Sequence, residues 1–130
     1  MKHVSHWIDG AEVRGEGRTG EIYNPATGEV TGQVAFATVA EVDAAVEAAK
    51  RAFPAWRDTS LVKRSKILFA FRELVDKHRD ELAALISSEH GKVHSDAMGE
   101  VARGLEVVEF ACGIPHLLKG GFSENVSTRV

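Results

Sequence analysis

The sequence predicts a mixed α/β chain in which two β-hairpin pieces are followed by four α-helices. Two observations support this. Up to residue 37, short apolar stretches alternate with turn signals. From Thr38 onward, the period at which apolar residues recur changes from two residues, as in a strand, to about 3.6 residues, as in an α-helix. The 130 residues, 44% apolar and 27% charged, are typical of one globular domain. We therefore expect hairpin strands over 1–37, a helical part over 38–120 and an extended tail over 121–130.

The first third contains two turn signals between short apolar stretches. Asp9-Gly10 tolerates the positive φ angles of a type I′ turn and predicts the first hairpin. The sequence NPATG at 24–28 predicts a second turn before the alternating apolar residues of 30–36. We expect His3 and His6 to lie in a poorly ordered terminus. Isolated hairpins are marginally stable in water, so the strands are expected to complete a sheet from elsewhere in a longer chain or another subunit.

The first helix is predicted from a capping box. In Thr38-Val39-Ala40-Glu41 the threonine hydroxyl can accept from the Glu41 amide while the glutamate reaches back to the Thr38 amide. We expect Pro54 to end this helix, because the residue before a proline avoids the helical region. The predicted apolar stripe consists of Val42, Val46, Ala49 and Phe53.

Three further helices follow by the same periodicity. The second begins near Ser60, and its apolar face is Ile67, Leu68, Phe71, Leu74 and Val75. The third runs from about Asp80, with Leu82, Leu85 and Ile86 buried, to Gly91, a residue suited to the left-handed position after a helix. The fourth is predicted to have Ser95 as its N-cap. Trp7 and Trp56 are expected to be packing residues.

Composition excludes several classes of function. The net charge of −3 arises from 16 basic and 19 acidic residues without a run of five like charges, so neither nucleic acid nor a membrane surface is an expected partner. No apolar run approaches the ~18 residues of a membrane span, and the first residues lack the apolar core of a signal peptide. A single cysteine permits no internal disulfide. These features predict a cytoplasmic protein.

Five stretches carry a resemblance to a known family. They are NPATGE (24–29), FPAW (53–56), KRSKILFAFRELV (63–75), ELAALISSEHGK (81–92) and GEVARGLEVVEFACGIPHLLKG (99–120). In this order they resemble the N-terminal part of an aldehyde dehydrogenase, and the last stretch is similar to the CoA-acylating methylmalonate-semialdehyde dehydrogenases. The α/β class of the whole fold is an expectation from this resemblance.

The resemblance also implies a chemistry. Members of the family are several times longer, bind NAD, oxidise an aldehyde held by a nucleophilic cysteine, and in this branch pass the acyl group to coenzyme A. The motifs for these steps lie downstream of the point that corresponds to Val130, so this chain is expected to contain no catalytic or cofactor-binding residue and to be inactive alone. The partners implied are the rest of the dehydrogenase chain, a semialdehyde substrate, and further subunits in a homodimer or homotetramer.

Cys112 is predicted to be structural. A nucleophilic cysteine needs a cation or a helix N-terminus to lower its pKa, and it needs access to substrate. Cys112 instead falls near the end of the fourth helix, where the helix dipole disfavours a thiolate. It also continues the predicted apolar stripe of Met98, Val101, Leu105, Val108 and Cys112. We expect a small buried thiol.

Arg103 is the candidate substrate-binding residue. Gly99 and Gly104 lie near it, although glycine costs about 1 kcal/mol relative to alanine inside a helix, which suggests that a helix or a ligand approaches closely. The spacing alone favours an ion pair with Glu100 or Glu106, each three residues away. The resemblance implies a different role, in which the guanidinium binds the carboxylate of a semialdehyde acid.

The histidines do not predict a metal site. His90 and His94 have a helical spacing, but Gly91 is predicted to end a helix between them, and no third ligand is nearby. We therefore expect no metal.

Two other functions remain open from the sequence. The chain can belong to an aldehyde dehydrogenase with another substrate, or it can be a short non-catalytic product that docks on the full-length enzyme.

Overall fold

The computed structural model describes residues 2–121, which form short strands followed by helices. The strands are β1 (Lys2–Val4), β2 (His6–Ile8), β3 (Ala11–Val13), β4 (Thr19–Tyr23) and β5 (Val30–Ala35). The helices are α1 (Val39–Asp58), α2 (Leu61–Lys77), α3 (Arg79–His90), α4 (His94–Cys112) and α5 (Ile114–Leu117). The order of strands and helices agrees with the predicted one. Residues 122–130 of the predicted extended tail lie outside the described residues.

Both predicted hairpins are present. Asp9 and Gly10 have φ angles of 54° and 75°, as a type I′ turn requires, and they join the antiparallel strands β2 and β3. In the second turn the Gly28 amide donates to the Asn24 carbonyl at 2.8 Å, and the Ala26 amide donates to Asn24 Oδ1 at 2.9 Å. This turn connects the antiparallel strands β4 and β5.

The N-terminal strand adds a pairing that the sequence analysis did not predict. β1 lies parallel to β5, with Lys2 opposite Gly32, so that one sheet has the order β1-β5-β4. The expectation of a poorly ordered terminus is therefore wrong, because His3 lies in β1 and His6 in β2. The backbone groups of β1 are satisfied by a strand nearly thirty residues away, which no local sequence signal specifies.

The start of α1 is as predicted and its end is not. The Thr38 amide donates to Glu41 Oε2 at 2.7 Å, and the Glu41 amide donates to Thr38 Oγ1 at 3.3 Å, which completes the capping box. The helix continues through Pro54 to Asp58. Proline removes the hydrogen bond to the carbonyl four residues earlier, but residues 49–58 are exposed, so water can satisfy that group.

The predicted apolar stripe of α1 is exposed in this chain. Val42 and Val46 are each 51% exposed and Phe53 is 58% exposed, and Ala48 is the residue of α1 that is buried. The two tryptophans, which were expected to be packing residues, are also exposed among residues 2–121, Trp7 by 74% and Trp56 by 44%.

Helices α2, α3 and α4 pack together and contain the main core. Ser60 caps α2, and Gly91, with a φ of 83°, follows α3, both as predicted. Ala83 and Ala97 are fully buried between α3 and α4, and Val101 is 8% exposed. The prediction that Leu82 and Leu85 are buried is wrong, because alanines make the close contact between the helices and the leucines lie at its edge, 36% and 53% exposed. On α2 likewise, Ile67, Phe71 and Leu74 are about half exposed.

The fourth helix begins two residues earlier than predicted, at His94. Its N-cap is Val93, which makes no capping hydrogen bond through its side chain, so the assignment of Ser95 is wrong. The inward stripe is confirmed at Val101 and Cys112, both buried. A further single turn, α5, follows Gly113, with Pro115 in its first turn.

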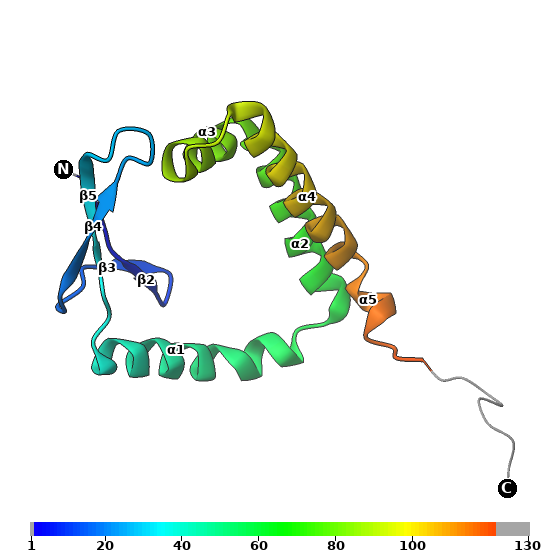
Figure 1. Ribbon diagram of the computed structural model, residues 1–130. Helices are drawn as coiled ribbons and strands as arrows, with labels where there is room; N and C mark the ends of the chain where they lie inside the picture. Colours follow the sequence, from blue (N-terminus) through cyan, green and yellow to red (C-terminus); the bar gives the residue numbers. More distant parts are fainter. Residues whose placement is uncertain (1, 122–130) are drawn as a thin grey trace, which may run out of the picture.

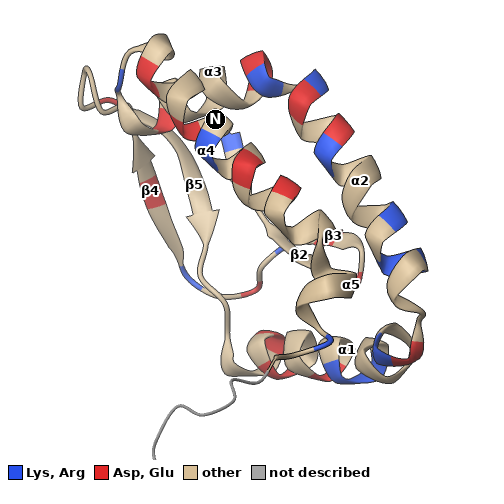
Figure 2. Ribbon diagram, turned by 90° about the vertical axis from the view of Figure 1, so that its right-hand side faces the viewer, with Lys and Arg blue, Asp and Glu red and all other residues tan. Residues whose placement is uncertain are grey.

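The helices and strands follow one another around a ring-like path (Figure 1). Figure 1 shows α1 extending from the strands at one end to the start of α2 at the other, with α3 and α4 packed on α2. Acidic and basic residues are interspersed along α1 and α2 (Figure 2). Among residues 2–121, no helix is both long and apolar enough to cross a membrane.

Candidate functional site

Arg103 lies on the face of α4 that points away from the core, and its side chain is exposed. Long side chains of a helix lean toward its N-terminus. Accordingly, a Cβ atom built on Gly99 would lie 3.7 Å from Nη1 of Arg103, so the guanidinium covers the turn that starts at Gly99. A methyl group at position 99 would thus be in ordinary van der Waals contact with the guanidinium.

Gly104 lies on a different surface of α4 from Gly99. It borders an apolar groove between α2, α3 and α4, lined also by Phe71, Val75, Leu82, Leu85, Ile86, Val101 and Val108. The groove has a volume of about 340 Å³ and is open. The two glycines thus do not form one site: Gly99 adjoins Arg103, whereas Gly104 lies on the side of α4 that faces the groove.

The predicted ion pairs of Arg103 do not form in this structure. Among the described residues, neither Glu100 nor Glu106 hydrogen bonds to Arg103 or lies within ion-pair distance of it. Glu100 is instead bound by Lys92, whose Nζ donates to Glu100 Oε1. That hydrogen bond lowers the pKa of Glu100, and the nearby positive charges of Lys92, Arg103 and His90 act in the same direction.

Lys92 is a residue of this site that sequence reasoning missed. It belongs to the stretch ELAALISSEHGK that carries part of the family resemblance, but no role followed from the sequence. Lys92 and Glu100 are eight residues apart, with Lys92 in the break between α3 and α4 and Glu100 within α4. A helical spacing rule does not detect such a pair, because it applies only within one helix.

Apolar side chains continue the exposed face that carries Arg103. Val107, one turn further along α4, is 68% exposed, and Phe110, two turns along, is 70% exposed. Arg103 therefore lies at one end of an apolar surface strip, and its guanidinium leans away from the strip, over Gly99.

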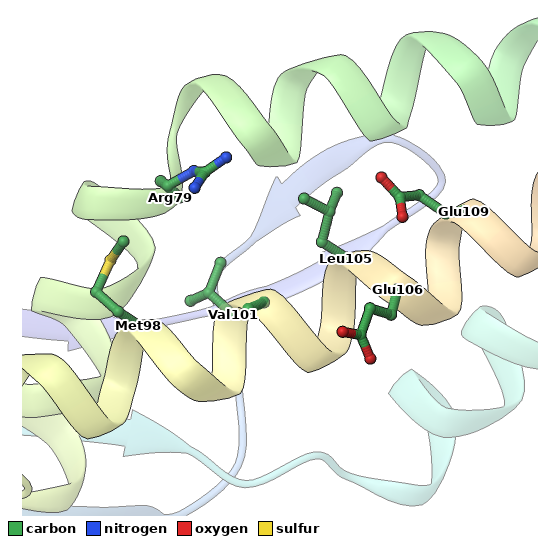
Figure 3. Close-up of a pocket in the computed structure, with 7 residues that line it drawn as sticks. Arg79, Met98, Val101, Leu105, Glu106 and Glu109 are labelled. Carbon is green, nitrogen blue, oxygen red and sulfur yellow. The ribbon is translucent and has the colours of Figure 1, made fainter.

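A separate cavity lies on the core side of α4, and Arg103 does not line it. Figure 3 shows Leu105 and Glu109 pointing toward α2, with Arg79 at the turn between α2 and α3, while Glu106 points the other way. The cavity has a volume of about 190 Å³. Two of its charged groups are already engaged, because Arg79 pairs with Asp76 and Glu109 accepts from Arg72 at 2.9 Å.

Cys112 is confirmed as a buried residue. It is the last residue of α4, and 7% of its surface is exposed. A substrate could not reach its sulfur in this structure. This burial agrees with the structural role predicted for the thiol.

The two spaced histidines lie on different helices. His90 is the last residue of α3 and His94 the first of α4, with Gly91 ending α3 between them as predicted. Within residues 2–121, no group of three or more histidine, cysteine or carboxylate side chains is placed to hold a metal ion.

Comparison with known proteins places the chain in a family. The aldehyde dehydrogenase family profile matches residues 13–129. The malonate-semialdehyde dehydrogenase of Pseudomonas aeruginosa is 42% identical over 130 residues, which are all of this chain and 26% of that protein. The mitochondrial acylating methylmalonate-semialdehyde/malonate-semialdehyde dehydrogenase of mouse is 48% identical over 90% of this chain and 22% of its own length.

Solved structures of the same family resemble this chain. A protein of Sinorhizobium meliloti, provisionally assigned as a methylmalonate-semialdehyde dehydrogenase and solved in complex with NAD, has a TM-score of 0.89 and 47% identity, covering 98% of this chain and 26% of that one. The methylmalonate-semialdehyde dehydrogenase of Oceanimonas doudoroffii has a TM-score of 0.90, 47% identity and the same coverage. The chain thus spans about a quarter of the length of these relatives. It belongs to the aldehyde dehydrogenase family.

Proposed function

We propose that this chain is the N-terminal part of an NAD-dependent, CoA-acylating methylmalonate- or malonate-semialdehyde dehydrogenase. Such an enzyme oxidises a semialdehyde acid to an acyl-CoA. The proposal is supported by relatives that act on malonate and methylmalonate semialdehydes. The observation that carries it is Arg103, whose guanidinium is exposed beside Gly99 and is engaged by no carboxylate among the described residues.

The proposed role of Arg103 is to recognise the carboxylate of the substrate. A semialdehyde acid differs from a plain aldehyde by this one group. The planar guanidinium can donate two parallel hydrogen bonds to a carboxylate, which fixes the orientation of the substrate as well as its affinity. Binding one end of the substrate in this way places the aldehyde end at a defined distance from α4 for the residues that act on it.

NAD does not fit the described residues themselves. Dinucleotide sites place the pyrophosphate at the N-terminus of a helix that follows a strand, where free amides can bind it. The strand-to-helix junction of this chain runs from β5 to α1, and its N-terminus is occupied by the Glu41 carboxylate, which accepts from the Thr38 and Glu16 amides. We therefore propose that NAD is held by a part of the enzyme that this chain does not include.

The chain is proposed to be inactive by itself. Its one thiol, Cys112, is buried at the end of a helix and is a poor candidate for a nucleophile. The expected result is that the purified 130-residue chain shows no oxidation of malonate semialdehyde with NAD and coenzyme A. Turnover by the purified chain, measured as NADH formation, would contradict this part of the proposal.

The proposed partners are the remainder of the dehydrogenase chain and further subunits. Exposed apolar residues on three elements support this, with Trp7 at 74%, Phe53 at 58% and Phe110 at 70%. Exposure of many large apolar side chains is typical of surfaces that another part of a protein covers. Sedimentation of the complete enzyme would test for a homodimer or homotetramer.

The decisive experiment concerns Arg103 in the complete enzyme. Arg103→Ala is expected to reduce the kcat/KM preference for malonate semialdehyde over propanal by about 10- to 100-fold, because a charged hydrogen bond contributes about 1.5–3 kcal/mol. Arg57→Ala is the matched control, since Arg57 is an exposed arginine of α1 that pairs with Asp58. An unchanged preference in Arg103→Ala would refute the proposed role.

The same assay separates the finer parts of the proposal. Omission of coenzyme A is expected to slow steady-state turnover of malonate semialdehyde, because the acyl group then lacks its acceptor. A higher kcat/KM for an aldehyde without a carboxylate would instead indicate an aldehyde dehydrogenase of another specificity.

A further inference from the structure

We propose that Lys92 is a positioning residue that holds the Glu100 carboxylate away from Arg103 and so keeps the Arg103 guanidinium free for the substrate. This inference rests on the proposed function of Arg103 and deepens it. Lys92 does not contact the substrate in this account. It acts by occupying the carboxylate inside the protein that would otherwise compete for the same guanidinium.

The position of Lys92 suits this role. It lies between α3 and α4, directly after Gly91, whose φ of 83° turns the chain away from α3. The Lys92 side chain is only 18% exposed, although lysine is usually a solvated residue, and its Nζ donates to Glu100 Oε1. The pair joins the segment before α4 to the second turn of that helix.

Glu100 is the natural competitor for Arg103. It lies three residues before Arg103 on α4, a spacing at which opposite charges on a helix meet. Because the Arg103 guanidinium leans back over the turn at Gly99, it approaches Glu100 rather than Glu106. The charge of Arg103 contributes to the lowered pKa of Glu100, yet the hydrogen bond to Glu100 comes from Lys92.

Loss of Lys92 should therefore allow Glu100 to compete with the substrate carboxylate for Arg103. Without its partner, Glu100 can rotate and pair with Arg103, and the fraction of enzyme with a free guanidinium falls. The apparent dissociation constant rises in inverse proportion to that fraction. For an exposed Glu100–Arg103 pair of the usual strength, the expected rise is about two- to sixfold.

The test uses the complete enzyme with Lys92→Met. The expected result is a rise of about two- to sixfold in KM for malonate semialdehyde with little change in its kcat, and no change in KM for propanal, which has no carboxylate. Lys50→Met is the matched control, because Lys50 also forms a pair with a glutamate, Glu47 at 2.8 Å on α1, away from Arg103. Lys92→Arg, which retains the positive charge, is expected to stay close to the wild-type KM.

A second substitution separates this account from a structural one. Adding Glu100→Gln to Lys92→Met removes the competitor and is expected to restore KM, whereas adding Glu106→Gln is expected not to. If the Glu100→Gln double variant stayed as impaired as Lys92→Met, Lys92 would contact the substrate or support the fold, and the proposal would be overturned. An unchanged KM in Lys92→Met would overturn it as well.

The outcomes also distinguish this inference from the proposed function. If Arg103→Ala lowers the preference for the carboxylated substrate but Lys92→Met does not, only the inference about Lys92 fails. If Arg103→Ala leaves that preference unchanged, the role of Arg103 itself fails. Should Lys92→Met lose propanal turnover through misfolding, Lys92→Gln with and without Glu100→Gln provides the same comparison.

Discussion

Helices α1 and α4 are nearly equal in length, with 20 and 19 residues, yet they have different relations to the rest of the chain. Helix α1 has a complete capping box and an apolar stripe, but the stripe is exposed. Helix α4 has no capping side chain, but Ala97, Val101 and Cys112 are buried. Helix α1 is thus defined by local signals and α4 by packing. A strong helical pattern in the sequence therefore does not indicate which part of the protein covers the apolar face of the helix.

The largest expected effect comes from overfilling the contact between α3 and α4. Ala83→Leu is expected to destabilise the chain by about 3 kcal/mol, because a fully buried alanine between two helices leaves no room for a larger side chain. The measurement is urea unfolding followed by circular dichroism. Ala49→Leu on the exposed side of α1 is the control, and an equal loss for both variants would remove the distinction between the two helices.

The next largest effect tests the local definition of α1. Thr38→Ala removes the hydroxyl that accepts from the Glu41 amide, and it is expected to cost about 1 kcal/mol in the same unfolding measurement. Thr38→Ser keeps the capping oxygen and is expected to retain most of the stability. If serine were as damaging as alanine, the cap would not be the reason for the loss.

Lowering the pH is expected to reduce the free energy of unfolding by less than Thr38→Ala does. Protonation of Glu41 removes its charge but leaves the Thr38 hydroxyl in place to cap α1. Hydrogen bonds from the Thr38 and Glu16 amides lower the pKa of Glu41 below its ordinary 4.5. Because the folded pKa is the lower one, this stabilisation is present above pH 4.5 and is lost as the pH falls through the folded pKa. In Glu41→Gln, the free energy of unfolding should depend less on pH below pH 4.5. If that dependence were unchanged, other carboxylates would be responsible for it.

The smallest effect is expected on the exposed stripe of α1. Val46→Ser is expected to change the stability of this chain by no more than about 0.5 kcal/mol, since Val46 is 51% exposed. In the complete enzyme the same substitution is expected to cost about 2 kcal/mol if another part of the protein covers the stripe. Equal effects in both proteins would show that α1 remains uncovered.

Much of the local structure could be predicted because its signals act over a few residues. The Asp9-Gly10 turn, the Thr38 capping box and the left-handed Gly91 are each determined by two to four neighbouring residues. The family followed from motifs in the same way, since the profile match covers the stretches that carry the resemblance. The inward face of α4 could also be predicted, because one helix period decides it.

Other features were decided only by the tertiary structure, because they depend on residues far apart in the chain. β1 pairs with β5 across the whole strand region, and Ala83 meets Ala97 where leucines were expected to form the core. At the candidate site the sequence identified Arg103 and its two possible glutamate partners, but not the lysine that takes one of them. The reason is geometric: Lys92 lies in the break before α4 and Glu100 lies within that helix, so no helical periodicity relates the two residues.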